Sequence, residues 1–391
     1  MLGAGGLAIS AEPGTPTSSS RHVETFEAAQ TALAAKDYAV VNAKAREVLA
    51  SSRKTADDIY IAYNFLTQAA RDRDGQIAGI EGMLESGFQL EAQTQSELHK
   101  VLANAYFAQK NYPQALKYGT ALIGSGAADE EIYSVVGQSY FHSSNYSESV
   151  KIFERLVSND EEGGRRPDRL QLVLLLSSHD KAGNKEPAQA AIEKLVRHYP
   201  EANAWLLLLQ EVKSERLDQR QKIHFFRLME STGNLKHGRD FMTYSDAATS
   251  LGLPGESRRV LEAAMTAKVF EQESDRSRAD QDLTAARERA EAHRAELREL
   301  ESEATAAPTG NEFVALGMAH YSFGQYPNAV EALKAGIAKG GLKNAADAQL
   351  TLGAAQLKSG QKAEAAQTLK AINAGDEITQ RIATLWALHA S

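Results

Sequence analysis

The sequence predicts an all-α protein built from consecutive helix pairs, and three observations carry this prediction. Tyr106 and Tyr140 lie 34 residues apart in segments that read alike, LANAYFAQKNYPQAL and VGQSYFHSSNYSESV. Nearly all of the chain from His22 onward has the period of an amphipathic helix, and only 9 prolines interrupt it. A fixed period of about 34 residues is typical of stacked helix-turn-helix units, which build binding surfaces and rarely carry catalysis themselves.

Composition limits the classes of protein to which this chain can belong. The 391 residues are 43% hydrophobic and 24% charged, as in folded soluble proteins, and suffice for two or three domains or one elongated array. A net charge of −8 disfavours nucleic acid as the main partner, because phosphate binding needs a clustered basic face. The chain has no cysteine, which excludes disulfides, thiolate metal sites and a cysteine nucleophile.

The first 21 residues stand apart from the rest. Residues 1–11 are small and apolar but lack a basic region, and residues 13–20 are rich in Pro, Ser and Thr. Either this leader is a signal peptide that has lost its front, which places the protein in the periplasm, or it is a flexible N-terminus of a cytoplasmic protein. No apolar run approaches the roughly 18–20 residues that a membrane span needs.

Helix pairs can be assigned in order along the chain. Turn residues and the apolar period place pair one at 23–50 and pair two at 56–85, with its turn at 71–75. Pairs three and four surround the two tyrosines, and pair five has its turn at 183–184. Pair six begins at Trp205, pair seven spans 238–268, and pairs eight and nine follow residue 309. A final helix, 376–390, is expected to cap the array, because the last pair has no neighbour to cover its apolar face.

The repeated residues are explained by the way in which the helices pack. A Gly or Ala stands where the two helices of a pair cross, so that their backbones can approach closely; Gly317 and Gly353 occupy this position in pairs eight and nine. The repeated tyrosines are expected to fill the gap between one pair and the next. A Gly at the turn tolerates the left-handed backbone that ends a first helix.

One segment departs from the pattern. From Ala279 to Ala304, mostly alanine residues recur at spacings of 4 and 3, which is a heptad seam flanked by charged residues. We expect one long helix over about 274–305. The segment is either a solvated spacer that packs on pair seven, or a docking helix for a second chain, or a disordered linker. The domain prediction is therefore a leader at 1–21, an N-terminal array at 22–268, a charged helical insertion at 269–308, and C-terminal pairs with a capping helix at 309–391.

These motifs resemble the tetratricopeptide repeat family over most of residues 22–391. The resemblance implies a right-handed α-solenoid of about nine helix pairs, no intrinsic catalysis, and protein or peptide binding in a concave groove. The stretch from His320 to Ile372, followed by ATLWALHA, is similar to a group of proteobacterial envelope proteins built from these repeats, which are commonly secreted to the periplasm. That group also places a charged helix between pairs like seven and eight.

Family members that bind chaperone C-termini use a clamp of Lys and Asn on one first helix and of Asn, Lys and Arg on the next two. Lys100 and Asn104 match the first helix of this clamp, but Val135, Leu170 and Leu174 occupy the following positions. The full clamp is therefore absent, and Lys100 and Asn104 are retained only as candidate groove residues.

No constellation of catalytic, metal-binding or cofactor-binding residues is visible. The ten histidines show no metal-ligand spacing, and the motifs G-x-x-x-x-G-K-[ST] and G-x-S-x-G do not occur. We therefore expect no enzymatic activity and no cofactor.

The positive candidates are groove residues. Phe107, Phe141 and Tyr321 stand one position past the repeated tyrosine positions, and exposed aromatic rings in a groove bind extended peptide segments well. The alternative is that these rings pack between helices. Gln138 and Asn104 are expected on the same face, where they can bond a peptide backbone.

Two function hypotheses follow. The first is a non-enzymatic scaffold of the bacterial cell envelope that binds a protein or peptide. The second is a structural assembly subunit that oligomerises or docks through the alanine-rich helix at 277–304.

Overall fold

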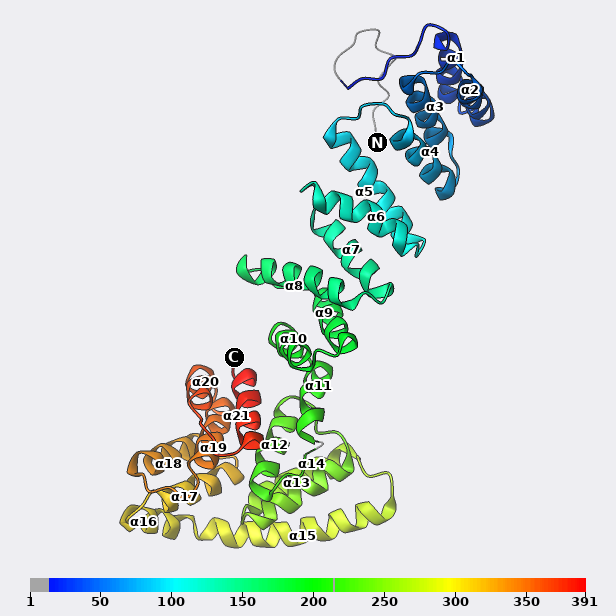
Figure 1. Ribbon diagram of the computed structural model, residues 1–391. Coiled ribbons are helices and arrows are strands. Elements are labelled where there is room, and N and C mark those ends of the chain that lie inside the picture. The colour runs from blue at the N-terminus through cyan, green and yellow to red at the C-terminus, as the bar shows by residue number, and fades with distance from the viewer. Residues whose placement is uncertain (1–13, 214) are drawn as a thin grey trace. The chain divides into compact units, whose positions relative to one another are not determined.

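The computed structural model describes residues 14–213 and 215–391, which are helical and contain no β-strand (Figure 1). The leader residues 1–11 lie outside the described residues. The helices of the described residues are α1 (Val23–Ala34), α2 (Tyr38–Ala50), α3 (Ala56–Ala69), α4 (Arg73–Glu85), α5 (Ala92–Ala108), α6 (Tyr112–Gly124), α7 (Glu130–His142), α8 (Tyr146–Glu162), α9 (Arg169–Ala182), α10 (Lys185–His198), α11 (Ala202–Lys213), α12 (Gln219–Ser231), α13 (Gly238–Ser250), α14 (Pro254–Ala267), α15 (Glu273–Ala295), α16 (Leu297–Ala306), α17 (Asn311–Ser322), α18 (Tyr326–Lys339), α19 (Ala345–Lys358), α20 (Lys362–Lys370) and α21 (Glu377–His389).

The prediction of an all-α fold with about nine helix pairs is confirmed. Within the described residues, α1 to α14 form seven consecutive pairs, α17 to α20 form two more, α15 and α16 are the insertion, and α21 is the final helix. The chain divides into two compact units, residues 1–188 and 189–391, so the boundary falls inside α10. The predicted boundaries at 268 and 308 both lie within the second unit.

Local sequence explains where the second helices begin. Asn111 caps α6 by accepting a hydrogen bond from the backbone N–H of Gln114, and Asp37 caps α2 by accepting one from Val40. A tyrosine then stands at the first helical position, Tyr112 in α6 and Tyr38 in α2. The second copy of the Asn-Tyr motif, Asn145-Tyr146, also begins a helix, α8, but the side chain of Asn145 makes no capping hydrogen bond.

The turn of pair two is shorter than the sequence suggests. Residues 71–75 were expected to form the turn, but α4 already begins at Arg73. The reason is Asp72, whose Oδ1 accepts a hydrogen bond from the backbone N–H of Gly75 at 2.7 Å and so caps the helix.

Close helix crossings occur where small residues were expected. A Cβ atom on Gly317 would lie 2.6 Å from Leu333 Cγ, and one on Gly353 would lie 2.5 Å from Leu369. Both distances are below any normal contact. Only glycine lets α17 pack on α18, and α19 on α20, at this spacing.

In the first unit each pair packs on its neighbours in sequence. The apolar core of α3 to α8 is continuous and includes buried Leu102, Leu122, Ile132 and Val136, with Tyr106 and Tyr140 packed against it. The tyrosines thus fill the space between successive pairs, as the repeat predicts.

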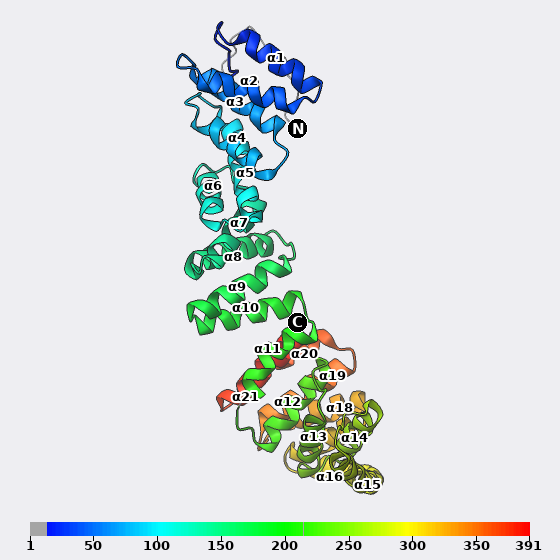
Figure 2. The same cartoon turned by 90° about the vertical axis from the view of Figure 1, so that its right-hand side faces the viewer.

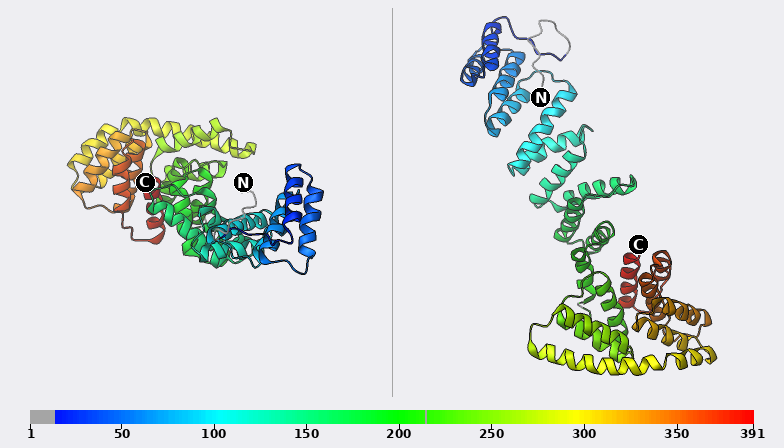
Figure 3. Two further views of the ribbon diagram at one scale, coloured as in Figure 1. Left: turned by 90° about the horizontal axis from the view of Figure 1, so that it is seen from above. Right: turned by 180° about the vertical axis from the view of Figure 1, so that it is seen from behind.

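The insertion in the second unit is helical but not one helix. It breaks at Glu296 into α15 and α16, and Figure 3 shows α15 lying along α13 and α14 in both views. Its seam residues Ala279, Leu283, Ala286 and Ala290 are at most 4% exposed, and Leu283 packs with Leu261 and Met242 of the preceding pair. Of the alternatives, the spacer that packs on pair seven is the one observed, and the segment is helical and not a disordered linker.

Pairs seven and eight contact one another directly across this insertion. The backbone N–H of Glu256 in α14 donates to Ser322 Oγ of α17 at 2.8 Å, and a Cβ atom on Gly255 would lie 2.6 Å from the ring of Phe323. The insertion therefore leaves the repeat stacking intact and covers its outer side.

The second unit closes on itself, so its helix pairs do not pack only on their neighbours in sequence. The final helix α21 packs on α20, as predicted for a cap, but also on α11, α12 and α19 (Figure 1). Trp386 of α21 is fully buried, and its Nε1 donates to the backbone carbonyl of His224 at 3.1 Å. No described helix is both long and apolar enough to span a membrane.

Candidate functional site

Lys100 and Asn104 lie on α5 and bind acidic residues at the start of α7. Lys100 Nζ pairs with Asp129 and lies 3.1 Å from Glu131 Oε2, while Asn104 Nδ2 donates to Glu131 Oε1 at 2.9 Å. The hydrogen bonds that Lys100 donates to Asp129 and Glu131 raise the pKa of its ammonium group. Both groups are thus engaged between neighbouring pairs, and a partner would have to displace these contacts.

Phe107 and Phe141 belong to a row of rings that crosses pairs three and four at their turns. We call this the aromatic row: Phe107, Tyr112, His142, Phe141 and Tyr146. Neighbouring ring centroids lie 6.1, 4.8, 5.6 and 5.6 Å apart along it. Its rings are half-buried, apart from His142, which is exposed. The row is therefore a preformed surface of rings in mutual contact, one pair stacked and the others tilted or edge-on, that water can still reach.

A recurring contact joins this row to the neighbouring pairs. Three of the tyrosines that begin a second helix are covered by a basic residue or histidine at or just after the end of the next first helix. Arg71 lies 3.0 Å above the ring of Tyr38, His142 stacks on Tyr112, and Lys181 Nζ lies 5.8 Å from the ring of Tyr146. Cation–π and stacking contacts of this kind each contribute roughly 0.5–1 kcal/mol at exposed sites. The rings therefore also hold successive pairs together.

The other two candidate residues differ from expectation. Gln138 is half-buried on α7, and its Nε2 donates to Ser134 Oγ one turn earlier. Tyr321 is only 4% exposed, and the guanidinium carbon of Arg227 lies 4.1 Å from its ring centroid. The expectation that Tyr321 faces a groove is wrong, because this position in pair eight is covered by α12.

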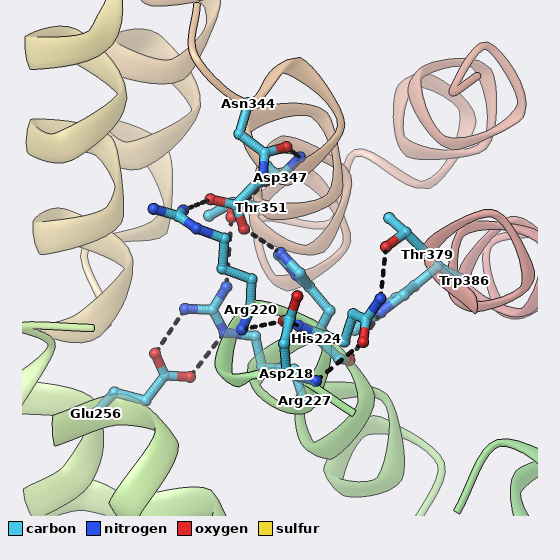
Figure 4. Close-up of polar contacts among 11 residues, drawn as sticks. Asp218, Arg220, His224, Arg227, Glu256, Asn344, Asp347, Thr351, Thr379 and Trp386 are labelled. Atoms are coloured by element: carbon cyan, nitrogen blue, oxygen red, sulfur yellow. Dashed lines mark hydrogen bonds and ion pairs between the residues drawn. The ribbon is translucent and has the colours of Figure 1, made fainter. Parts of the chain in front are cut away.

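Tyr321 packs instead on Arg227, a member of a buried polar cluster in the second unit that the sequence did not point to. Figure 4 shows the polar contacts of this cluster around Arg227 and His224. Arg227 of α12 forms a two-pronged ion pair with Glu256 of α14, at 2.8 Å from Nε and 2.6 Å from Nη2. Tyr244 of α13 donates to Glu256 Oε1 at 2.7 Å. All the oxygen and nitrogen atoms of this pair face partners rather than solvent.

A second part of the cluster joins α12 to α19. His224 Nε2 lies 2.6 Å from Asp347 Oδ1, and Arg220 pairs with Asp347 Oδ2. Asn344 caps α19 by accepting a hydrogen bond from the backbone N–H of Asp347 at 3.1 Å. In Figure 4 the side chains of Arg220 and His224, both from α12, converge on the carboxylate of Asp347 in α19.

Burial and pairing set the charge states of the cluster. Burial lowers the pKa of His224 below its usual value, and His224 Nδ1 has no hydrogen-bond partner among the described residues. The imidazole is therefore neutral, with its Nε2–H donating to Asp347. Burial alone would raise the pKa of Asp347, but the hydrogen bond from His224 and the charge of Arg220 lower it.

The Arg227–Glu256 pair is ionised. Burial opposes ionisation of Glu256, but the charge and hydrogen bonds of Arg227 outweigh it and lower the pKa of this carboxyl group. An uncompensated charge in this position would be strongly destabilising.

The contacts of the cluster hold helices together. A cavity of about 110 Å³ adjoins it, lined by residues that include Asp218, Arg220, Asp347 and Asp376, and Asp218 and Asp376 cap α12 and α21. Across residues 14–213 and 215–391, no three His, Asp or Glu side chains are grouped so as to hold a metal ion. The cluster ties α12, α14, α19 and α21 together.

A signal for the cluster was present in the sequence. His224 and Arg227 lie three residues apart within IHFFRLM, at positions where the helical period calls for buried residues. Charged residues on a buried face require partners, but the sequence does not reveal that Arg227 pairs with Glu256, 29 positions away, and His224 with Asp347, 123 positions away.

Part of the chain matches a known protein family. Residues 314–377, which contain α18, α19 and α20 and most of α17, match the tetratricopeptide repeat. No curated protein matches the chain.

Similar solved structures have low identity. They include Naa15/Naa10 bound to HypK-THB (14% identity, TM-score 0.34, covering 90% of this chain and 63% of that chain), the TPR2AB domain of yeast Sti1 in complex with pHSP90 (12%, TM-score 0.26, 77% and 100%), and the pentatricopeptide repeat protein PPR10 from maize (12%, TM-score 0.31, 93% and 61%). The chain thus spans 63% of the Naa15/Naa10 chain that it matches. The family match and the helix pairs agree: the chain carries tetratricopeptide repeats at residues 314–377 within an all-α fold of consecutive helix pairs.

Proposed function

We propose that the protein is a non-enzymatic scaffold that binds an extended segment of a partner protein along the aromatic row of the first unit. The observation that carries this proposal is the row itself: five rings, from Phe107 to Tyr146, follow one another across two helix pairs with no centroid separation above 6.1 Å.

The physical argument concerns the cost of binding. Aromatic rings bury a large area with few rotatable bonds. Because these rings already pack against one another, a partner does not have to order them, and less of the binding free energy is lost. A segment with apolar side chains spaced along an extended backbone fits such a row.

The alternative of an assembly subunit has less support. It requires the alanine-rich seam to be open to a second chain, whereas Ala279 and Ala290 are fully buried against the chain's own helices. The remaining exposed face of α15 is charged, and charged surfaces are depleted at the core of stable interfaces.

We further propose that the protein works in the bacterial cell envelope. The support is the small apolar leader at residues 1–11 and the resemblance of the C-terminal stretch to envelope proteins. Cell fractionation of the native organism tests this: the protein should appear with periplasmic markers after osmotic shock, and its retention with cytoplasmic markers would overturn the localisation.

Binding is tested by crosslinked recovery of partners from native cells. The variant Phe107→Ala combined with Phe141→Ala should recover a specific partner at least about tenfold less well, a loss of roughly 1.4 kcal/mol or more. Phe313→Ala is the matched control, because Phe313 is a partly buried aromatic residue of the second unit. Equal recovery by the double variant and the control, with both folded by circular dichroism, sinks the proposal.

A further inference from the structure

The first unit has a second concave feature away from the aromatic row. It is a cleft of about 350 Å³ between α2 and α4, with the C-terminal half of α3 as its floor; Figure 2 shows these three helices following one another. Five of its lining residues are Gly or Ala: Ala69, Ala70, Gly75, Ala78 and Gly79. The small side chains leave the space open.

Close packing explains why the lining residues that come from α4 have such small side chains. A Cβ atom on Gly79 would lie 2.2 Å from Thr67 Oγ1, and one on Gly75 would lie 3.1 Å from the Cβ atom of Ala70. Glycine at these positions brings α4 tightly onto α3. The exposed Ala78 has no such constraint, so its small size serves the cleft and not the packing.

Polar groups without partners line the wall formed by α2 and α3. Within the described part of the chain, the side chains of Asn42 and Arg46 make no hydrogen bond or ion pair, and neither does the hydroxyl group of Tyr63. One donor amide, one guanidinium and one phenol hydroxyl therefore face the same cleft with free hydrogen-bonding capacity.

A second guanidinium group lies at the end of the cleft. Arg71 is held over the ring of Tyr38, which fixes its position while leaving its N–H groups free to donate. The one carboxylate in the lining belongs to Asp72, and its Oδ1 already accepts the capping hydrogen bond of α4. The cleft therefore carries two arginines against one engaged acid, in a chain whose net charge is −8.

We propose that this cleft binds a carboxylate side chain of an acidic segment in a partner protein. A guanidinium group presents paired N–H donors that match the two oxygens of a carboxylate, and Arg46 and Arg71 supply two such groups. The apolar floor of Leu66, Ala69 and Ala78 accommodates the aliphatic part of the bound residue and its backbone. This contact is independent of the aromatic row and adds a charge-selective site to the scaffold.

The test is selection of short random peptides displayed on phage against the full-length protein. Peptides retained by the wild-type protein should be enriched in Asp and Glu, and a synthetic copy of a selected peptide should bind Arg46→Gln at least about tenfold more weakly. Replacing its Asp and Glu by Asn and Gln should cause a similar loss. Ala78→Leu, which fills the cleft without changing charge, should also abolish binding.

The matched control is Arg53→Gln, which removes the same charge from an exposed residue outside the lining. It should bind as the wild type does. Retained peptides without acidic enrichment, or unchanged binding by Arg46→Gln and Ala78→Leu, would overturn the proposal. Displacement of the peptide by millimolar inorganic phosphate would overturn it too, because the site would then be a general anion site. The Phe107→Ala/Phe141→Ala variant should retain acidic peptides, so this test stands apart from that of the aromatic row.

Discussion

His224 Nε2 lies 2.6 Å from Asp347 Oδ1, although the two residues are 123 positions apart in the sequence. The backbone carbonyl of His224 also accepts a hydrogen bond from Trp386 in the last helix. One residue of α12 thus binds both α19 and α21, and this contact helps to turn a row of helix pairs into a closed unit.

The first prediction concerns acid sensitivity. Burial lowers the pKa of His224 below the usual value of 6.5, so the folded state favours the neutral ring. Its stabilising contribution is complete above pH 6.5 and is lost as the pH falls below that value, because the unfolded chain binds the proton first. Thermal unfolding followed by circular dichroism should therefore show a melting temperature that falls between about pH 7 and pH 5.

A non-titrating variant checks the cause. In His224→Gln the side-chain amide can still donate to Asp347 but takes up no proton, so the slope of melting temperature against pH should be smaller than in the wild type. A residual slope is expected from His389, whose pKa burial also lowers. Identical slopes in both proteins would show that His224 is not the sensor.

The second prediction concerns the buried ion pair. Arg227→Met leaves the carboxylate of Glu256 buried without its partner and should lower the free energy of unfolding by about 3–5 kcal/mol. Adding Glu256→Gln removes that charge and should recover part of the loss, with a coupling of roughly 0.5–3 kcal/mol. Urea unfolding of Arg227→Met, of Glu256→Gln alone and of the double variant gives the three free energies that the coupling requires.

A surface pair provides the control for this cycle. Lys44 and Glu47 form an ion pair at 2.8 Å with side chains 37% and 58% exposed, so Lys44→Met should change stability by no more than about 0.5 kcal/mol. Additive losses in the Arg227 and Glu256 variants would contradict the coupling.

The third prediction concerns the crossing glycines. Gly317→Ala places a Cβ atom 2.6 Å from Leu333 Cγ, so α17 and α18 must separate, at a cost of about 1–3 kcal/mol. Gly124→Ala is the matched control, because nothing lies within 4 Å of its added Cβ, and alanine there should be neutral or stabilising by up to about 1 kcal/mol. Equal effects of the two substitutions would argue against a close crossing at Gly317.

The fourth prediction concerns the alanine-rich seam. Ala286→Arg inserts a charged side chain where Ala286 is 4% exposed, and should lower the free energy of unfolding by about 1–3 kcal/mol. The molar mass measured by light scattering should not change, because the seam is filled by the chain itself. Arg289→Ala, on the exposed side of α15, should leave stability and mass unaltered; a lower mass for Ala286→Arg would restore the assembly hypothesis.

Much of the fold could be predicted because it depends on contacts between residues close in sequence. Tyr106, Tyr140 and their neighbouring Asn-Tyr pairs mark the start and spacing of helices, and Gly317 and Gly353 mark the crossings. The boundaries of pairs one, two and seven follow from the apolar period and the capping residues, which act within a single helix turn.

The candidate site was harder to predict. Position in the repeat placed Phe107 and Phe141 among partly exposed rings, but the same reasoning placed Tyr321 in a groove, where it is in fact covered by Arg227. Repeat position specifies which side of a helix a residue occupies. It does not specify whether another part of the chain returns to cover that side.

The sequence by itself determined the helices, their pairing and the small residues at their crossings, because all of these arise from interactions over a few turns of one chain segment. Only the tertiary structure decided that the alanine seam is filled from within, that α21 returns to α11 and α12, and that Arg227 and His224 meet Glu256 and Asp347. Such contacts join segments far apart in the chain, and the local periodicity of a helix carries no information about which distant helix will lie beside it.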